Sequence, residues 1–315
     1  MDLRQLRYFV EVADAQSFNE AAARLGIAQS SLSRRVQDLE DELGVRLLTR
    51  NARGVALTAA GTVLLGRAAA LLRDAEAARA EVAERSNLPA GEVTIGTSPA
   101  FSRLLLGRVA ERFAPDHPRL RIHFVEGAQY QIFEGLDTGR IDLAVMVSPD
   151  EIRSCTIEPI MTEPLYFVTA PANRRAARAM LVAELEGAPL ILFPRPSGNR
   201  NYLDRKAEEA GIRLDVRYEL ADLSAQKEFI ARGFVSGILP TSAVYEEVRR
   251  RALAVSPVRG LMLTRTLVTR TDRARTPAVA AVADSIRSVM RGLVAEKAHG
   301  GDMRLIDGRK QGGQS

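Results

Sequence analysis

The chain is poor in the side chains that build metal centres and disulfides. It has one cysteine, Cys155, which excludes an intrachain disulfide and a zinc thiolate cluster. Its histidines, His117, His123 and His299, are not spaced as metal ligands. Tryptophan is absent, and no glycine-rich phosphate loop of the GxGxxG or GxxxxGKS/T type occurs. We therefore expect no cofactor and no metal, and His117 and His123, in or beside a predicted strand, are best explained as structural residues.

Long apolar runs are also missing. No stretch approaches the roughly 18 apolar residues of a membrane-spanning helix, so no membrane partner is expected. The first residues lead directly into a helical pattern, without a charged-then-apolar signal segment, and we expect a cytoplasmic protein. With 46% hydrophobic and 26% charged residues, the composition is typical of a globular protein. A net charge of +5 permits nucleic-acid binding without requiring it.

The most informative pattern lies between Ser17 and Thr58. Ser17 and Glu20 form a capping-box signature at the start of a short helix, and Gly26-Ile27 supplies a tight turn. A second helix is predicted over Gln29–Leu43. Its apolar stripe consists of Leu32, Val36, Leu39 and Leu43.

The opposite side of this second helix carries hydroxyl, amide and guanidinium groups, which can read base edges or hold phosphates. Its acidic residues lie at the far end, so the sequence predicts a helix that enters a DNA groove by its N-terminus. The alternative is an ordinary solvated helix face. Residues 46–57 are predicted to form a two-stranded wing whose tip arginines contact DNA. The candidate DNA-binding residues are Gln29, Ser30, Ser31, Ser33, Arg34, Gln37, Arg50 and Arg53.

Thr58 begins a long predicted helix that ends near Arg85. Apolar residues recur along it at alternating steps of four and three, which is typical of a coiled-coil seam between two chains. The alternative is a helix that packs on its own domain. The seam residues are Leu64, Ala68, Leu71, Ala75, Ala78 and Val82, widened by Leu65 and Leu72.

From Glu92 onward, predicted strands alternate with predicted helices. This rhythm indicates an open, mainly parallel sheet, and a second such unit begins near Pro164. Two α/β lobes joined by two crossings leave a cleft where strand ends and helix N-termini meet. Glycines recur among polar residues after Ala298, and this stretch is predicted to be a disordered tail.

The N-terminal pattern resembles the winged helix-turn-helix of the LysR-type transcriptional regulators. In that family, proline and alanine usually stand where this chain has Ser30 and Ser31, and phenylalanine often replaces Leu48. The serines affect base preference rather than fold. The matching segments are Leu6-Arg7-Tyr8-Phe9, Ser17-Phe18, Ala21-Ala22, Leu25, Gln29-Ser30-Ser31-Leu32-Ser33, Leu39-Glu40, Leu43-Gly44, Leu47-Leu48-Thr49-Arg50 and Leu57-Thr58-Ala59-Ala60-Gly61.

The resemblance implies an N-terminal winged helix-turn-helix (α+β), a long linker helix and a two-lobed α/β effector domain that resembles a periplasmic solute-binding fold. It also implies a regulator that binds double-stranded DNA, assembles as a homodimer or homotetramer and responds to an effector, with RNA polymerase as a further candidate partner. The expected divisions are 1–58 for the DNA-binding domain, 59–88 for the dimerisation linker, 92–161 with 268–296 for lobe I, 162–267 for lobe II, and 297–315 for the tail.

Four segments follow predicted strands or border the cleft. Thr97 and Ser98 offer hydroxyls at a helix start, a natural seat for an anion, and Arg195 can clamp a carboxylate. The expected effector is a small carboxylate or amino acid. Plainer roles stay open: helix capping for the two hydroxyls, a solvated charge for Arg195, and packing for Tyr130. The candidate effector-binding residues are Thr97, Ser98, Gln129, Tyr130, Arg195, Ser197, Phe234 and Val235.

Two other functions remain as alternatives to the regulator. An enzyme with an attached DNA-binding module would need a nucleophile with its base, a metal cluster or a phosphate loop, and Cys155 has no positioned histidine beside it. We therefore expect a non-enzyme. An architectural DNA-binding protein without any effector is the third hypothesis, and it predicts a cleft with no affinity for metabolites.

Overall fold

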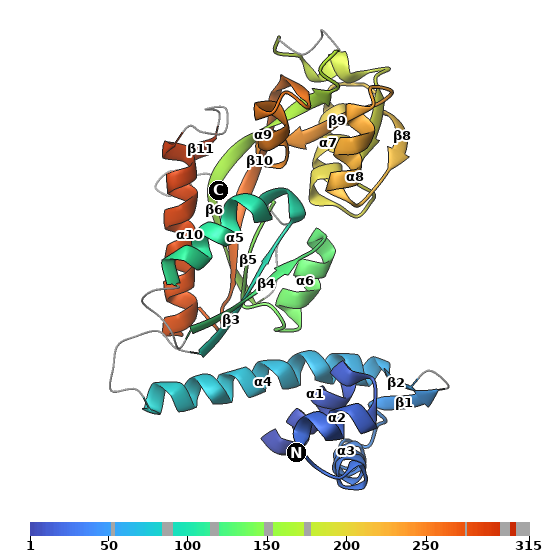
Figure 1. The fold of residues 1–315 in the computed structure, drawn as a ribbon, viewed down its shortest axis with the longest axis vertical. Helices are drawn as coiled ribbons and strands as arrows, with labels where there is room; N and C mark the ends of the chain where they lie inside the picture. Colours follow the sequence, from blue (N-terminus) through green and yellow to red (C-terminus); the bar gives the residue numbers. More distant parts are fainter. Residues whose placement is uncertain are drawn as a thin grey trace.

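A computed structural model of the chain describes residues 1–51, 54–83, 91–113, 120–147, 154–172, 178–274, 276–296 and 303–306. These residues form a small N-terminal module and a two-lobed α/β domain, with one long helix between them (Figure 1). The N-terminal helix-turn-helix and the two-lobed domain confirm the predicted fold class.

The N-terminal module contains three helices and a two-stranded wing. Asp2 and Gln5 cap the first helix reciprocally, and the Ser17 hydroxyl accepts a hydrogen bond from the Glu20 amide at the start of the second. Gly26 and Gly44 end the second and third helices with φ of 66° and 68°, a conformation that glycine adopts without strain. The elements are α1 (Leu3–Ala15), α2 (Phe18–Leu25), α3 (Gln29–Leu43), β1 (Leu48–Asn51) and β2 (Gly54–Leu57).

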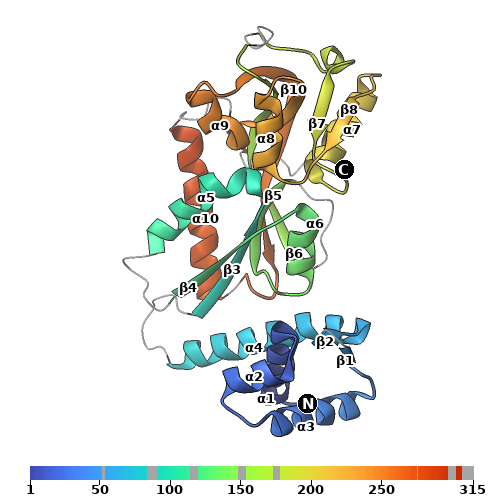
Figure 2. The ribbon, with the colours of Figure 1, turned by 45° about the vertical axis from the view of Figure 1, so that its right-hand side comes forward.

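Helix α4 (Ala59–Ala83) runs between the module and lobe I and presents different residues to each (Figure 2). Ala68 is fully buried with Leu6 and Phe9 of α1, and Leu64, Leu65 and Leu72 pack against the same cluster. Much of the predicted inter-chain seam is therefore used inside the chain, because α1 covers it. Val63 and Leu71 remain 67% and 45% exposed on the face left open.

Lobe I packs helices on both faces of its part of the sheet. Leu143 and Val145 of β5 lie in the core with α5 and α10, whereas the alternating residues Ala144 and Met146 lie against α6. The elements of this lobe are β3 (Gly91–Thr97), α5 (Pro99–Phe113), β4 (Leu120–Glu126), α6 (Gln129–Asp137), β5 (Leu143–Val147) and α10 (Pro277–Ala295).

Lobe II repeats this layered arrangement. Leu190 and Leu192 of β7 pack towards α7, and Ile191 points to the opposite face, towards α8 and α9. Its elements are η1 (Val182–Leu185), β7 (Pro189–Leu192), α7 (Gly198–Glu209), β8 (Asp215–Glu219), α8 (Leu223–Ala231), β9 (Ser236–Pro240) and α9 (Thr241–Arg249).

Two long antiparallel strands, β6 (Cys155–Thr169) and β10 (Ala254–Arg270), run through both lobes. In the large sheet shared by the two lobes, neighbouring strands follow the order β4-β3-β5-β10-β6-β9-β7-β8. Pairing of β10 with β6 is interrupted between Pro257 and Met262, where the register shifts. The lobes are thus joined by two paired strands whose regular pairing is broken within lobe II.

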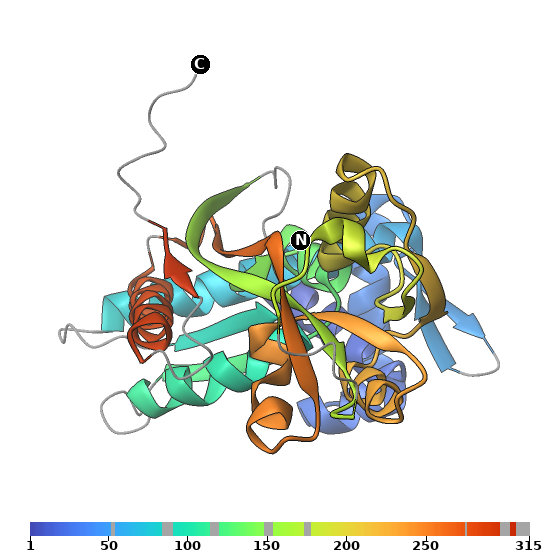
Figure 3. The ribbon, with the colours of Figure 1, turned by 90° about the horizontal axis from the view of Figure 1, so that it is seen from above.

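A short strand from the C-terminal segment completes the sheet. Residues 303–306 were predicted to belong to a disordered tail, but Arg304–Leu305 form β11, which pairs with Met161 and Thr162 of β6 (Figure 3). Met303 is 6% exposed in the lobe I core. Residues 303–306 are ordered because Arg304–Leu305 pair with the open edge of β6 and Met303 packs into the lobe I core. The remaining predicted tail, 297–302 and 307–315, lies outside the described residues.

None of the helices in the described residues has the length and apolarity needed to cross a membrane.

Candidate functional site

Helix α3 lies on the side of the N-terminal module opposite the two lobes (Figures 1 and 2). Leu32, Val36 and Leu39 form its buried face, each at most 2% exposed. Of the predicted contact residues, Ser33 is half-buried, and the exposed ones are Gln29, Ser30, Ser31, Arg34 and Gln37. The first turn of α3 carries no acidic residue, so the helix dipole and its free N–H groups favour an approaching phosphate.

A buried carboxylate fastens the wing to the end of α3. Glu40 is 6% exposed and accepts hydrogen bonds from the backbone N–H groups of Leu47, at 2.7 Å, and Leu48, at 3.0 Å. The Arg46 guanidinium donates to it at 2.6 Å. Burial disfavours the charged carboxylate, but these donors outweigh burial and hold the pKa of Glu40 below its ordinary value.

Strands β1 and β2 confirm the predicted wing, with Leu48 opposite Leu57 and Asn51 opposite Gly54. The two arginines predicted at its tip are not placed: the Arg50 side chain and the whole of Arg53 lie outside the described residues.

A cavity of about 770 Å³, here called the cleft chamber, lies between the lobes. Four helices begin at it, because the carboxyl ends of strands from both lobes point to the same space. The first residues of α5 and α6 come from lobe I, and those of α7 and α8 from lobe II. Five predicted residues line it, namely Ser98, Gln129, Tyr130, Arg195 and Ser197.

Two polar atoms at the cleft chamber, one from each lobe, are shielded from solvent and lack a hydrogen-bond partner among the described residues. They are the Ser98 Oγ before α5 and the Asn199 Oδ1 in the first turn of α7. A buried polar group without a partner is costly, so these atoms favour a polar ligand between them. Asn199 was not predicted, although its place two residues after Ser197 could have identified it.

Arg195 forms an ion pair within lobe II. Its guanidinium donates to the Asp204 carboxylate at 2.5 and 2.9 Å, and Arg200 donates to the same carboxylate. The other charged residues at the cleft chamber, all unpredicted, are Arg103, Glu126 and Asp222. Their loops and helix ends carry no spacing pattern that singles them out in the sequence.

Three predicted effector residues are not brought to the cleft chamber. Thr97 ends β3, and its buried hydroxyl donates to the Val145 carbonyl of the neighbouring strand at 3.0 Å. Phe234 and Val235 precede β9 instead of following it. They therefore lie at the opposite edge of lobe II, in a separate depression of about 280 Å³.

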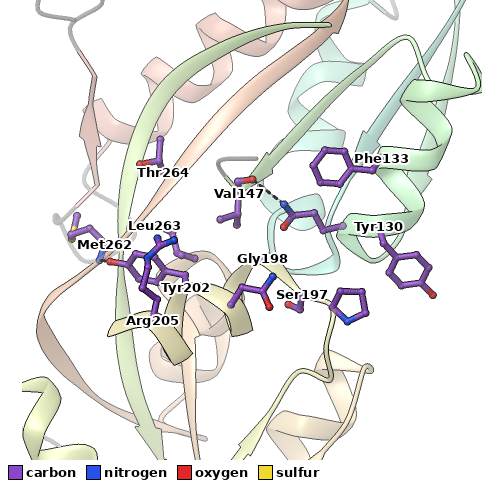
Figure 4. A pocket seen from close by; sticks show the side chains of 13 residues that line it. Tyr130, Phe133, Val147, Ser197, Gly198, Tyr202, Arg205, Met262, Leu263 and Thr264 are labelled. Atoms are coloured by element: carbon purple, nitrogen blue, oxygen red, sulfur yellow. Dashed lines mark hydrogen bonds between the residues drawn. The ribbon is translucent and has the colours of Figure 1, made fainter. Parts of the chain in front are cut away.

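A smaller cavity of about 400 Å³, here called the hinge chamber, adjoins the cleft chamber beside β10 (Figure 4). The two chambers share Gln129, Tyr130, Val147, Pro196 and Ser197. The hinge chamber is further lined by Phe133, Gly198, Asn201, Tyr202, Arg205, Met262, Leu263 and Thr264.

The described residues contain no group of His, Cys, Asp or Glu side chains arranged to hold a metal ion. Cys155 is half-buried, and burial raises its pKa.

Family comparisons cover both parts of the chain. Residues 3–62 match the family described as "Bacterial regulatory helix-turn-helix protein, lysR family", and residues 86–291 match "LysR substrate binding domain". The chain is 30% identical to the HTH-type transcriptional regulator BbuR of Bordetella bronchiseptica over 314 residues, which cover 98% of this chain and 96% of BbuR.

Two solved structures have the same arrangement. A full-length OxyR variant from Pseudomonas aeruginosa superposes with a TM-score of 0.74 at 26% identity, covering 92% of this chain and 96% of OxyR. Full-length CbnR complexed with its target DNA superposes with a TM-score of 0.67 at 26% identity, covering 92% of this chain and all of CbnR (100%).

Proposed function

Because the chain belongs to the LysR family of bacterial regulatory helix-turn-helix proteins, we propose that it controls transcription by binding specific DNA sequences in response to a small-molecule effector. The observation that carries the proposal is the exposed polar face of α3, a helix that lies on the side of the module away from the two lobes (Figures 1 and 2). As a DNA-binding regulator, it would act in the cytoplasm and not as an enzyme.

Base recognition is assigned to the N-terminal half of α3. Arg34 can donate two hydrogen bonds to a guanine, and Gln37 can pair with an adenine in the major groove. Gln29, Ser30, Ser31 and Ser33 would contact bases or nearby phosphates, and Arg50 and Arg53 of the wing would hold the backbone. CbnR was solved on its target DNA with the same domain arrangement, which supports this orientation.

A homodimer would present two copies of α3, and a homotetramer would present four. Val63 and Leu71 lie on the open face of α4, which can pair with a second chain. A symmetric dimer would place two reading helices on half-sites about 34–36 Å apart and select a palindromic sequence. RNA polymerase is a candidate partner at such a promoter.

The effector is assigned to the space between the lobes. Ser98, Gln129, Tyr130, Arg195 and Ser197 line the cleft chamber, and the unpartnered oxygens of Ser98 and Asn199 favour a polar ligand there. Thr97, Phe234 and Val235 are better explained by structural roles. A ligand that contacts both lobes stabilises one lobe arrangement over another, and this preference alone can alter the DNA-bound assembly. An architectural protein without an effector would leave those polar atoms unused.

Arg34→Ala tests the assigned reading face. A selection from random duplexes with the full-length protein first defines the preferred site. The variant should then lose about 1–3 kcal/mol of discrimination at one base pair while binding random DNA with similar affinity. Arg217→Ala, on the edge strand β8, removes the same charge far from α3 and should change neither quantity. Unaltered sequence preference in the Arg34 variant would refute the assignment.

A further inference from the structure

The hinge chamber differs from the cleft chamber in charge. Among the described residues that line it, Arg205 is the one charged side chain, whereas the cleft chamber combines Arg103 and Arg195 with Glu126 and Asp222. The Arg205 guanidinium lies 4.0 Å from Glu209, and an exposed pair of this kind is weak. Its charge therefore remains available to an anion in the hinge chamber.

Aromatic and aliphatic side chains form a large part of the remaining wall, beside polar groups such as Asn201 and Thr264. Tyr202 holds its ring beside β10, because its hydroxyl accepts a hydrogen bond from the Met262 N–H at 3.0 Å. The Arg205 guanidinium lies 5.7 Å from the centre of that ring. Figure 4 shows Tyr202 and Arg205 on one side of the chamber and Phe133 and Tyr130 on the other. Val147, Met262 and Leu263 complete this apolar surface.

Two helices also begin at the hinge chamber. The first residues of α6 and α7 line it, and in the described chain neither Ala128 nor Ser197 caps its helix with a side-chain hydrogen bond. The N–H groups of both first turns therefore add to the preference for a negative charge.

From this combination we propose that the hinge chamber binds a monocarboxylate with a compact aromatic body. The carboxylate pairs with Arg205, and the ring packs among Tyr202, Phe133 and Leu263. This assignment rests on the proposed function, because it names the ligand class and the compartment of the same interlobe space. The chamber's volume of about 400 Å³ is within the range of small-molecule sites.

Such a ligand would touch three parts of the fold at once. Gln129 and Phe133 belong to lobe I, Tyr202 and Arg205 to lobe II, and Met262–Thr264 to the crossing strand β10, directly after its register shift. Binding therefore favours the lobe arrangement that brings these walls together. The effector would therefore contact the crossing strand β10, which joins the lobes, as well as the two lobes themselves.

Phenylacetate is a suitable probe for the full-length protein, with neutral phenylacetamide as its matched control. Phenylacetate should raise the melting temperature, and phenylacetamide should have little effect because it cannot pair with Arg205. Arg205→Gln should weaken phenylacetate binding, measured by calorimetry, by about tenfold or more. Arg217→Gln on β8 removes the same charge from a residue that lines neither chamber, and it should bind phenylacetate as the wild type does.

The proposal is overturned if phenylacetate fails to bind the wild type, or if Arg205→Gln binds it normally. A loss caused by Arg195→Gln alone would move the carboxylate to the cleft chamber and also overturn it. DNA selection with the unliganded protein and its Arg34→Ala variant is measured without any ligand. A failure there identifies an error in the DNA-binding assignment, whereas normal DNA selection without phenylacetate binding refutes the hinge chamber specifically.

Discussion

Gln129 of lobe I and Gly198 of lobe II meet across the space between the lobes. The Gln129 amide donates to the Val147 carbonyl at 3.3 Å, and its oxygen lies against the Gly198 backbone. A methyl group on residue 198 would overlap that oxygen and lie 2.8 Å from Cδ of Gln129. This contact brings the two lobes together, and a side chain at residue 198 would require the end of the Gln129 side chain to move.

We expect Gly198→Ala to force Gln129 aside or to part the lobes. The free energy of unfolding should fall by about 0.5–1.5 kcal/mol, because a displaced Gln129 loses its hydrogen bond to Val147, although alanine is the better helix former. Small-angle scattering and urea unfolding measure the two effects. The double variant Gly198→Ala with Gln129→Ala removes the overlap and should recover stability.

Gly107→Ala in α5 is a matched control for this substitution. No atom outside its own helix lies within 4 Å of the added methyl group among the described residues. This variant should be neutral or slightly stabilised. Equal behaviour of the Gly198 and Gly107 variants would mean that the interlobe contact is not tight in solution.

The N-terminal module was predictable because its signals are local. The bounds predicted for α3, Gln29 and Leu43, agree with the structure, since the helix follows a tight turn and ends at a glycine. The sequence could not show which surface the apolar stripe of α4 packs against. Leu64, Ala68 and Leu72 suit either a second chain or α1, and only the tertiary arrangement shows that α1 covers them.

Part of the lining of the interlobe space was also predictable from the sequence. Ser98, Gln129 and Ser197 follow strands of parallel pairs, and the carboxyl ends of such strands share one edge. Phe234 does not reach the cleft chamber, because it precedes β9 and so lies at the other end of that strand. The hinge chamber depends on Met262–Thr264 and Tyr202, which are far apart in sequence and meet only through the path of β10.

Glu40→Gln should loosen the wing from the end of α3. The carboxylate binds two backbone N–H groups and Arg46, and an amide cannot replace all of these acceptor contacts. We expect a loss of about 1–3 kcal/mol at neutral pH. Hydrogen exchange at the Leu47 and Leu48 amides measures it locally, and Asp38→Asn, on an exposed part of α3, should leave both amides protected.

The stabilisation that Glu40 provides should decrease as the pH falls. The folded pKa of Glu40 is below its ordinary value of 4.5, so the contribution is present above that value and is lost as the pH falls through the folded pKa. The difference between wild type and Glu40→Gln should therefore shrink in acid. A difference that grew on acidification would mean that the folded structure does not favour the charged carboxylate.

Cys155 should respond weakly to oxidants. Burial raises its pKa, so its reactive thiolate fraction at neutral pH is smaller than that of a free cysteine. We expect slow alkylation that accelerates as the pH rises, and DNA affinity that is unchanged by mild peroxide treatment. Cys155→Ser should bind DNA normally. Peroxide-dependent DNA binding that the serine variant abolished would replace the effector proposal with a thiol-based sensor.

A buried ionic cluster joins α4 to lobe I. Arg273, 4% exposed, donates to Asp74 of α4 at 2.7 Å and to the fully buried Asp142 at 2.9 Å. Asp142 also accepts the Thr94 N–H at 2.8 Å, and the Arg73 guanidinium lies 3.8 Å away. Arg273 and Arg73 therefore both link lobe I to α4, the helix that carries the DNA-binding module.

Arg273→Gln should destabilise the protein much more than Asp74→Asn. Removing Arg273 leaves the buried Asp142 carboxylate with the Thr94 N–H and the more distant Arg73, and breaking a buried pair in this way typically costs about 3–5 kcal/mol. Asp74 is 47% exposed, so its loss should cost at most about 1 kcal/mol. Urea unfolding measures both, and hydrogen exchange in the described part of α4 reports its release from lobe I. Similar losses from the two substitutions would show that Asp142 does not depend on Arg273, and the coupling between effector lobe and DNA-binding module would then lie elsewhere on α4.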